Sequence, residues 1–182
     1  MICDHNLLGK GAYFYDGCTN VPLIVKYPGQ READVNSSPV QLNDLFATAM
    51  CAAGLEAPIP AESRPLQGGQ QRKIAVCEYR GCSQMDLGVF PHPVQATMIR
   101  GTRYKLNLYH DTNEMQLFDM ERDPQELRDL AQDPAYQGVA AQLMQTYLNE
   151  KAAEDYRLNA SRGGLSEIPA FSKLSQRLKK PE

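Results

Sequence analysis

The 182-residue chain lacks several features that define specialised classes of protein. It has no apolar run near the roughly 18–20 residues that a membrane-spanning helix needs. It has no excess of basic charge, because 22 acidic residues outweigh 19 Lys and Arg residues and give a formal net charge of −3. That balance argues against nucleic-acid binding through a general basic surface. We therefore expect a soluble protein that neither spans a membrane nor binds nucleic acid.

Cysteine pairs with the spacing of metal or redox motifs are also missing. The five cysteines include no C-x-x-C pair, which argues against a zinc ribbon or a thioredoxin-type site. An odd number in a chain of this length does not indicate a disulfide scaffold. The first residues have neither the basic nor the long apolar region of a signal peptide. No targeting segment is visible, and the compartment stays open.

The apolar residues indicate a strand and a helix in the first third of the chain. A continuous apolar run at residues 21–27, followed by a Pro-Gly pair, is typical of a strand buried on both faces in a parallel sheet. Helical spacing predicts a helix over residues 42–53 that ends at Gly54. The apolar face of that helix is expected to comprise Leu42, Leu45, Phe46, Ala49 and Met50. A Pro- and Gly-rich stretch over residues 56–72 is the predicted boundary between two lobes.

The second lobe is predicted to be a small antiparallel sheet followed by helices. Candidate strands lie at residues 73–79, 96–100, 104–109 and 115–119. Short connections with turn residues imply antiparallel neighbours. Asp123, followed by Pro124 and Glu126, predicts a helix start with a capping box. Asp133 and Pro134 repeat the pattern at the start of a helix expected to run to about residue 155.

Several of these segments, in this order, resemble the sulfatase family of the alkaline-phosphatase superfamily. The first comprises residues 4–16 (DHNLLGKGAYFYD), followed by VPLIV at 21–25 and Pro-Gly at 28–29. The second comprises MIR at 98–100, RYK at 103–105, QLFD at 116–119, DPQE at 123–126 and DLA at 129–131. Between them, LNDLFAT at 42–48 is similar to an Asp-Leu-x-x-Thr helix of the family. The Lys-Gly and strand motif also resembles phosphonate monoester hydrolases of the same superfamily.

The resemblance implies an α/β fold that is α+β within this chain. The expected architecture is the C-terminal part of an alkaline-phosphatase-like sulfatase fold, with a small antiparallel sheet subdomain packed by a C-terminal helix. Residues 1–60 would end the large α/β domain, residues 61–158 would form the antiparallel subdomain with its helices, and residues 159–182 would form a tail.

The family's reaction is the hydrolysis of sulfate esters. The resemblance implies a formylglycine nucleophile made from Cys or Ser in a C/S-x-P-x-R motif, and a calcium ion held by Asp and Asn side chains. The chain contains neither the Cys nor the Ser form of that motif. The family's metal-binding Asp pairs are also not found in it. We therefore expect no calcium ligands in this chain, and little or no activity from the chain alone.

Three residues are candidates for the site that binds the sulfate group. Lys10 matches the family's active-site lysine, whose ammonium contacts the sulfate oxygens. His5 matches the second Asp-His of the same loop and is expected either to hydrogen-bond the substrate or to stabilise the loop. His92 lies between two prolines and is expected either to face the substrate or to be an ordinary solvated histidine.

Three functions remain open from the sequence. The first is that the chain is part of a hydrolase for a sulfated small molecule or glycan. The second is that it is a non-enzymatic module that binds sulfated glycans or a partner chain. The acidic net charge disfavours the second. Hydrolysis of phosphate or phosphonate monoesters is a third reading.

An apolar patch near residues 13–55 is expected to be exposed and prone to self-association, because few parallel strands are present to cover it.

Overall fold

The computed structural model describes residues 3–9, 11–55, 62–67, 72–81 and 94–161. The chain divides into two compact units. One comprises residues 1–40 and 71–146, and the other comprises residues 41–70 and 147–182. Among the described residues, no helix is both long and apolar enough to cross a membrane.

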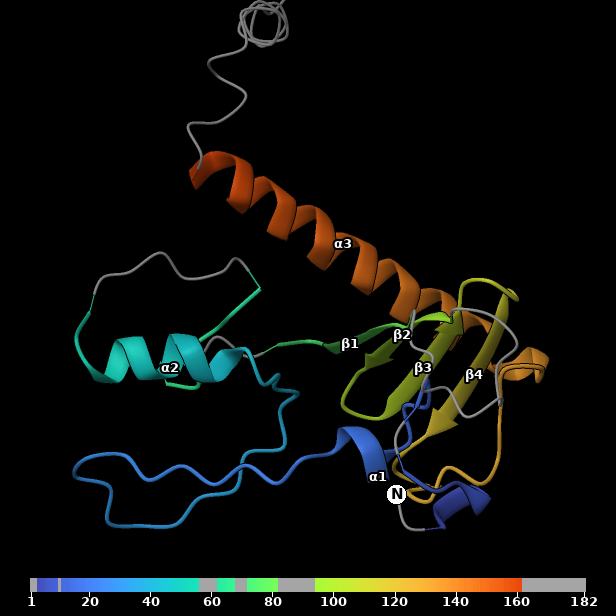
Figure 1. The fold of residues 1–182 in the computed structure, drawn as a ribbon, viewed down its shortest axis with the longest axis horizontal. Coiled ribbons are helices and arrows are strands. Elements are labelled where there is room, and N and C mark those ends of the chain that lie inside the picture. Colours follow the sequence, from blue (N-terminus) through green and yellow to red (C-terminus); the bar gives the residue numbers. More distant parts are fainter. Residues whose placement is uncertain (1–2, 10, 56–61, 68–71, 82–93, 162–182) are drawn as a thin grey trace, which may run out of the picture. The chain divides into compact units, whose positions relative to one another are not determined.

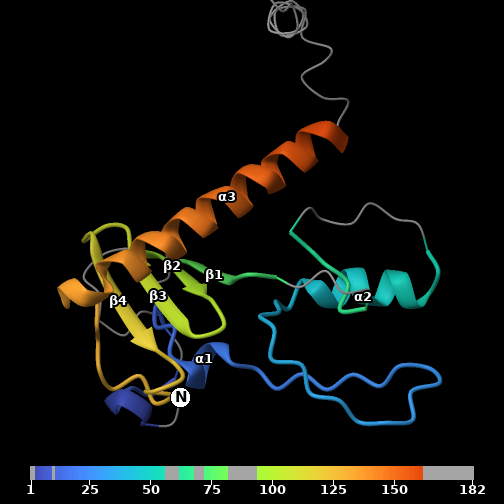
Figure 2. The same cartoon turned by 180° about the vertical axis from the view of Figure 1, so that it is seen from behind.

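The first unit is built on a four-stranded antiparallel sheet. Its strands are β1 (Ala75–Arg80), β2 (Gln95–Arg100), β3 (Tyr104–Tyr109) and β4 (Glu114–Asp119). They lie side by side in chain order, as Figures 1 and 2 show from opposite sides. The predicted meander is confirmed, and the predicted bounds of its strands agree with the observed ones to within two residues.

Side chains alternate between two covered faces of this sheet. On what we call the helix face, Ile99, Leu106 and Leu117 occupy paired positions and are fully buried. Tyr136 makes an edge contact with Tyr104 of this face, at a ring-centroid distance of 6.4 Å. The residues that follow Tyr136 form the long helix α3 (Gln137–Ser161). The start of α3 thus belongs to the same unit as the sheet.

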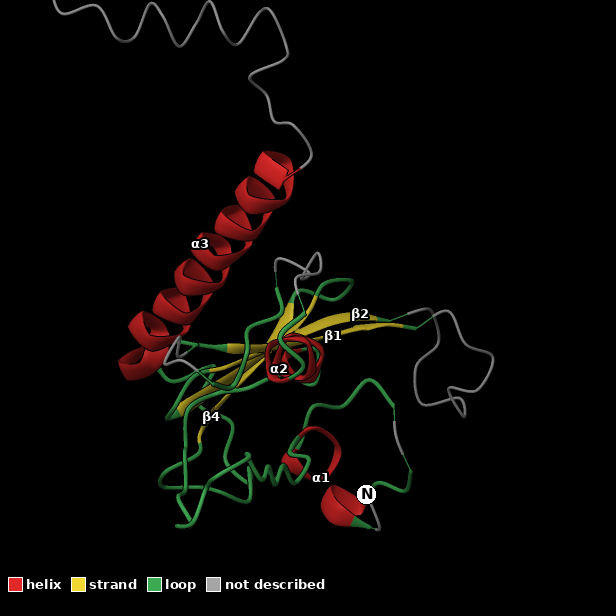
Figure 3. Ribbon diagram, turned by 90° about the vertical axis from the view of Figure 1, so that its left-hand side faces the viewer, coloured by secondary structure: helices red, strands yellow, loops and turns green. Residues whose placement is uncertain are grey.

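The opposite face of the sheet is covered by the beginning of the chain. Ala12 and Phe14 form a buried cluster with Ala96 and Met98 of β2 and with Val94. We call this side the loop face. The covering segment continues into the short helix α1 (Asp16–Thr19) and follows the 3₁₀ helix η1 (Asp4–Asn6). Both short helices lie on one side of the sheet in Figure 3.

The start of α3 follows its predicted signal, although the helix is longer than expected. The Asp133 carboxylate accepts a hydrogen bond from the Ala135 N–H at 3.0 Å, and Pro134 begins the 3₁₀ helix η2 (Pro134–Tyr136) that leads into α3. The α-helix then continues to Ser161, about two turns beyond the predicted end near residue 155.

The predicted buried strand at residues 21–27 is wrong. This segment forms no strand, and the side chain of Ile24 is 95% exposed. A strand needs a hydrogen-bonded neighbour, and among the described residues the sheet strands pair only within β1 to β4. The exposed apolar side chains expected near residues 13–55 are present: Val21, Leu23, Ile24, Val35, Val40, Leu42, Leu45, Phe46 and Leu55.

The predicted helix in the second unit is confirmed as α2 (Asp44–Ala52), but its predicted buried face is wrong. The buried side chains are Asp44, Ala47 and Thr48, whereas Phe46 is 46% exposed. The polar pair fastens the segment after the helix. An Asp44 carboxylate oxygen accepts a hydrogen bond from the Arg64 N–H at 2.8 Å, and the Thr48 hydroxyl accepts one from the Leu66 N–H at 3.0 Å. These hydrogen bonds, rather than apolar burial, select the face that turns inward.

The two apolar regions should respond differently to truncation. Ile99→Ala removes a fully buried side chain from the sheet and should lower the free energy of unfolding by about 2–5 kcal/mol. Ile24→Ala, at a 95% exposed position, should change it by less than about 0.5 kcal/mol. Urea unfolding of both variants measures the difference. Equal losses would show that residues 21–27 are packed as in a buried strand.

Candidate functional site

The segment that carries the candidate residues has an unusual backbone. Cys3, His5 and Asn6 have φ values of 66°, 53° and 58°, and Gly9 has a φ of 85°. Left-handed backbone is unfavourable for residues other than glycine and is concentrated at functional sites. Hydrogen bonds hold the turn around η1, including one from the Cys3 N–H to the Leu7 carbonyl oxygen at 3.0 Å.

Of the three predicted site residues, the structure describes His5. Its imidazole stacks on the Tyr15 ring with a centroid distance of 3.7 Å and an interplanar angle of 9°. Tyr15 in turn makes a tilted contact with the Phe118 ring of the loop face, at a centroid distance of 6.0 Å. The His5 ring is thus connected to the sheet through Tyr15. Lys10 and His92 lie outside the described residues.

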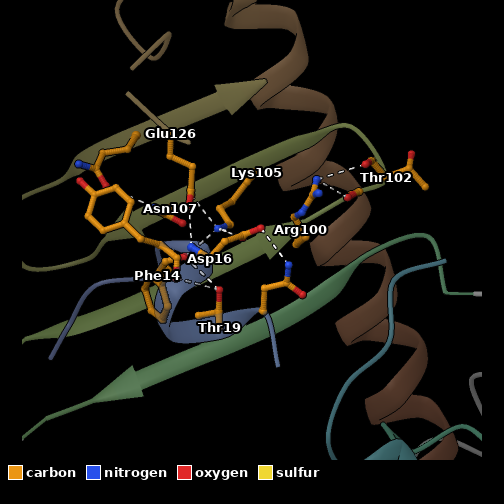
Figure 4. A network of polar contacts seen from close by, with 12 residues as sticks. Phe14, Asp16, Thr19, Arg100, Thr102, Lys105, Asn107 and Glu126 are labelled. Atoms are coloured by element: carbon orange, nitrogen blue, oxygen red, sulfur yellow. Dashed lines mark hydrogen bonds and ion pairs between the residues drawn. The ribbon is translucent and has the colours of Figure 1, made fainter. Parts of the chain in front are cut away.

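A buried lysine fastens the covering segment to the sheet (Figure 4). The Lys105 Nζ atom donates to the Phe14 carbonyl oxygen at 2.8 Å, to Asp16 Oδ1 at 2.5 Å and to Glu126 Oε1 at 2.7 Å. Its side chain is 1% exposed. An ammonium group has three hydrogens to donate, so these three acceptors satisfy it completely.

Glu126 closes the network by bridging Lys105 and the start of α1. Its second carboxylate oxygen, Oε2, accepts a hydrogen bond from the Asp16 N–H at 2.6 Å. The residue is 3% exposed and has a φ of 56°, so its backbone too is in the left-handed region. Asp16 therefore binds the network through both its backbone and its side chain. We call Lys105, Asp16 and Glu126 the lysine network.

The capping box and helix predicted at residue 123 are wrong. Turns and irregular backbone follow β4 as far as η2, and no helix is formed there. The Asp123 carboxylate accepts from the Arg128 N–H at 2.8 Å, while Glu126 points to Lys105 instead of back to the backbone of residue 123. An unpaired buried ammonium is costly, and satisfying Lys105 outweighs the modest gain from a helix cap.

Arg100 brings a second cation close to the lysine network. It occupies the position opposite Lys105 on the neighbouring strand, and it donates to the carbonyl oxygens of Gly101 and Thr102 at 2.9 and 3.2 Å. Burial lowers the pKa of Arg100, while the carboxylates of Asp16 and Glu126 act in the opposite direction. Two cations and two carboxylates thus balance in charge on the loop face.

An ion pair at the end of β4 supports the turn that leads to Glu126. Arg103 donates to both carboxylate oxygens of Asp119, with its Nη2 at 2.7 Å from Oδ2 and its Nε at 3.0 Å from Oδ1. Asp119 Oδ1 also accepts from the Glu121 N–H at 3.3 Å. The hydrogen bonds from Arg103 lower the pKa of Asp119. The carboxylate therefore organises the turn in its ionised form.

The described residues do not form a calcium site. No group of three or more His, Cys, Asp or Glu side chains among them is arranged to hold a metal ion. The carboxylates of Asp16 and Glu126 are bound to Lys105. These residues offer no oxygen cage of the kind that calcium requires.

Sequence reasoning missed the lysine network. Each member lies in a segment that resembles the family, yet nothing in the sequence pairs a strand lysine with carboxylates 89 and 21 positions away. The pattern at Tyr104, Lys105 and Leu106 gave no signal either, because alternation in a strand puts Lys105 on the face opposite to its two apolar neighbours, where a lysine is ordinarily solvated.

Comparison with known proteins places this architecture in a family. The family model described as N-sulphoglucosamine sulphohydrolase, C-terminal, matches residues 4–154. This range includes the candidate loop, the whole sheet and most of α3. The chain therefore belongs to this family and corresponds to the C-terminal portion of a sulfatase.

Individual relatives agree with the family match. A Delta 4,5-hexuronate-2-O-sulfatase of Bacteroides thetaiotaomicron is 33% identical over 171 residues, which cover 86% of this chain and 34% of the relative. An N-acetylglucosamine-6-O-sulfatase of the same organism is 29% identical, over 81% of this chain and 27% of the relative. The chain thus spans about a third of the length of the curated relatives that it matches.

A solved structure supports the fold as well. A crystal structure from Bacteroides thetaiotaomicron, of a protein described as a sulfatase, has a TM-score of 0.70 and 30% sequence identity to this chain. The similarity covers 84% of this chain and 34% of that chain. The expected fold class, part of an alkaline-phosphatase-like sulfatase fold with an antiparallel sheet and a C-terminal helix, is confirmed.

The ion pair of Asp119 predicts a loss of stability in acid. Because its pKa is lowered in the folded chain, the contribution of Asp119 is complete above the unfolded value of about 3.9 and is lost as the pH falls through the lower folded value. The urea concentration at the unfolding midpoint should therefore decrease as the pH is lowered below about 4. Asp119→Asn should make this decrease less steep.

Urea unfolding over this pH range measures the effect, with Asp155→Asn, a change at an exposed position of α3, as the matched control. An unchanged acid slope in Asp119→Asn, or an equal flattening in the control, would contradict the assignment.

Proposed function

We propose that this chain is the part of a sulfatase that completes the pocket for the sulfate group of a sulfated glycan or sugar. The observation that carries the proposal is the family match over residues 4–154, which begins at the Asp4-His5 pair and includes Lys10. The names of the relatives, a hexuronate-2-O-sulfatase and an N-acetylglucosamine-6-O-sulfatase, favour a sulfated sugar as the substrate class.

Lys10 is proposed to contact the sulfate oxygens, and His5 to hydrogen-bond the substrate or the loop around it. Negative charge develops on the sulfate and on the leaving oxygen during ester cleavage. A fixed ammonium at that point stabilises the transition state more than the ground state. His92 is a further candidate for contact with substrate. We also propose that residues 1–60 end the large α/β domain of the sulfatase, that residues 61–158 form its antiparallel subdomain, and that residues 159–182 form a tail.

The nucleophile of this reaction is proposed to lie outside the chain. No C/S-x-P-x-R motif occurs in its sequence. Charge stabilisation without a nucleophile supplies only a small part of the catalysis. The isolated chain should therefore hydrolyse sulfate esters poorly or not at all, and the calcium ion that the family uses would be held by residues elsewhere in a whole enzyme.

A chimera tests the role of Lys10. This chain would replace the matching third of the 33% identical hexuronate-2-O-sulfatase, and hydrolysis of that enzyme's own substrate would be measured. Lys10→Ala should lower kcat/KM by about 10²–10³-fold, the typical effect of removing one group that stabilises the developing charge. Lys26→Ala, which removes an exposed lysine of the same unit, should leave kcat/KM within about twofold.

The thermal unfolding of each chimera shows whether it is folded. A folded, active chimera that is indifferent to Lys10→Ala would refute the role of Lys10. Rapid aryl-sulfate hydrolysis by the 182-residue chain alone, well above its own Lys10→Ala control, would refute the proposal that the nucleophile lies elsewhere.

We further propose that the isolated chain associates with itself through the exposed apolar side chains of residues 21–24. Ile24 is 95% exposed and Val21 is 54% exposed. Ile24→Lys should shift the population toward monomer in light scattering coupled to size exclusion, because a charge opposes burial of that surface. Leu127→Lys, at a 73% exposed position elsewhere, is the control. A wild-type chain that is monomeric at all concentrations would contradict this.

A further inference from the structure

The lysine network occupies a buried position at which apolar packing would stabilise the sheet equally well. Lys105 is on the loop face of β3, next to the apolar cluster that Phe14 forms with Ala96 and Met98. Desolvating the Lys105 ammonium and the Glu126 carboxylate has a large free-energy cost, and replacing buried ion pairs with apolar residues is often neutral or stabilising. A network of this kind therefore points to a need for one defined arrangement of the groups that it joins.

The groups that it joins belong to the segment that carries His5. Every acceptor of Lys105 apart from Glu126 lies in this segment, at the Phe14 carbonyl and the Asp16 carboxylate. Glu126 adds a bond to the Asp16 N–H. Tyr15, the residue between these two anchors, holds the His5 ring in a parallel stack. The backbone on both sides of Tyr15 is thus fixed to the sheet by charged hydrogen bonds.

We propose that Lys105 is a positioning residue that acts through Asp16 and Glu126 on the His5–Tyr15 pair and on the segment leading to Lys10. The proposal rests on the function proposed for that segment. Lys105 itself touches no substrate, because its three hydrogens are all donated within the protein. Its contribution is to place one short segment relative to the sheet, and the left-handed backbone of Glu126 is retained because a carboxylate is required at that point.

The test separates loop placement from the stability of the sheet. Lys105→Met alone leaves the buried Glu126 carboxylate and the partly buried Asp16 carboxylate without this cation and should lower the melting temperature strongly. The triple variant Lys105→Met, Asp16→Asn, Glu126→Gln removes all three charges and should keep the sheet folded. In NMR spectra of the 182-residue chain, amide exchange of the triple variant at Ile99 and Leu106, which are register partners in β2 and β3, should stay within about threefold of wild type, whereas exchange at the backbone amide of position 16 should rise at least about tenfold.

The His5 ring protons provide a second readout, because stacking on Tyr15 shifts their resonances. The triple variant should move these resonances toward those of Tyr15→Leu, which gives the unstacked reference. Lys26→Met, which removes the same charge at an exposed position, should leave them unchanged. Unchanged His5 resonances and unchanged exchange at position 16 in a folded triple variant would overturn the proposal. Equal loss of protection in the sheet would also overturn it, since Lys105 would then serve general stability.

These measurements need no enzymatic activity, so their outcome is independent of the proposed function. A second arm joins the two. In the sulfatase chimera, the triple variant should lower kcat/KM at least about tenfold, since a displaced group in the site weakens catalysis steeply. An unchanged kcat/KM in a chimera whose His5 resonances have moved would show that the positioning does not matter for catalysis. The function proposed for Lys10 is tested separately, by the Lys10→Ala variant.

Discussion

The first unit depends on one buried cation. Lys105 joins three parts of the chain that are far apart in sequence: the segment around Phe14 and Asp16, the strand β3, and the turn that carries Glu126. Apolar packing around Phe14 would hold the covering segment against the sheet in several alternative positions, because such contacts have little direction. Hydrogen bonds to a charged group are directional and stronger. They select one position among those that packing allows.

The sheet was predictable from the sequence because its information is local. Each strand of the meander is short, is separated from the next by turn residues, and pairs with its neighbour in the chain. The cap at Asp133 is equally local, since its partner is the N–H two residues away. By contrast, residues 21–27 have the composition of a buried strand but no neighbouring strand among the described residues, so they form no strand and most of their side chains are exposed.

The parts of the candidate site that were missed depend on distant partners. Glu126 has the sequence context of a helix start, and it is diverted by a lysine 21 positions away. Asp44 and Thr48 occur on the polar side of a helical pattern, yet they face inward because backbone N–H groups of residues 64 and 66 need acceptors. In both cases a hydrogen bond that sequence periodicity does not register decides the local structure. The resemblance to sulfatases identified the segments involved, but the physical role of these side chains emerged only from their contacts.

The dependence of Lys105 on Asp16 also limits how the chain can be divided experimentally. An expression product that starts after the first 60 residues would contain all four strands and α3, but its Lys105 ammonium would lie on an uncovered sheet face without the acceptors of Phe14 and Asp16. Of the three oxygen acceptors of that ammonium, only the Glu126 carboxylate would remain. The sheet should therefore be excised as a separate piece together with residues 12–16, which supply the other two acceptors of Lys105 and the apolar cover of Ala12 and Phe14.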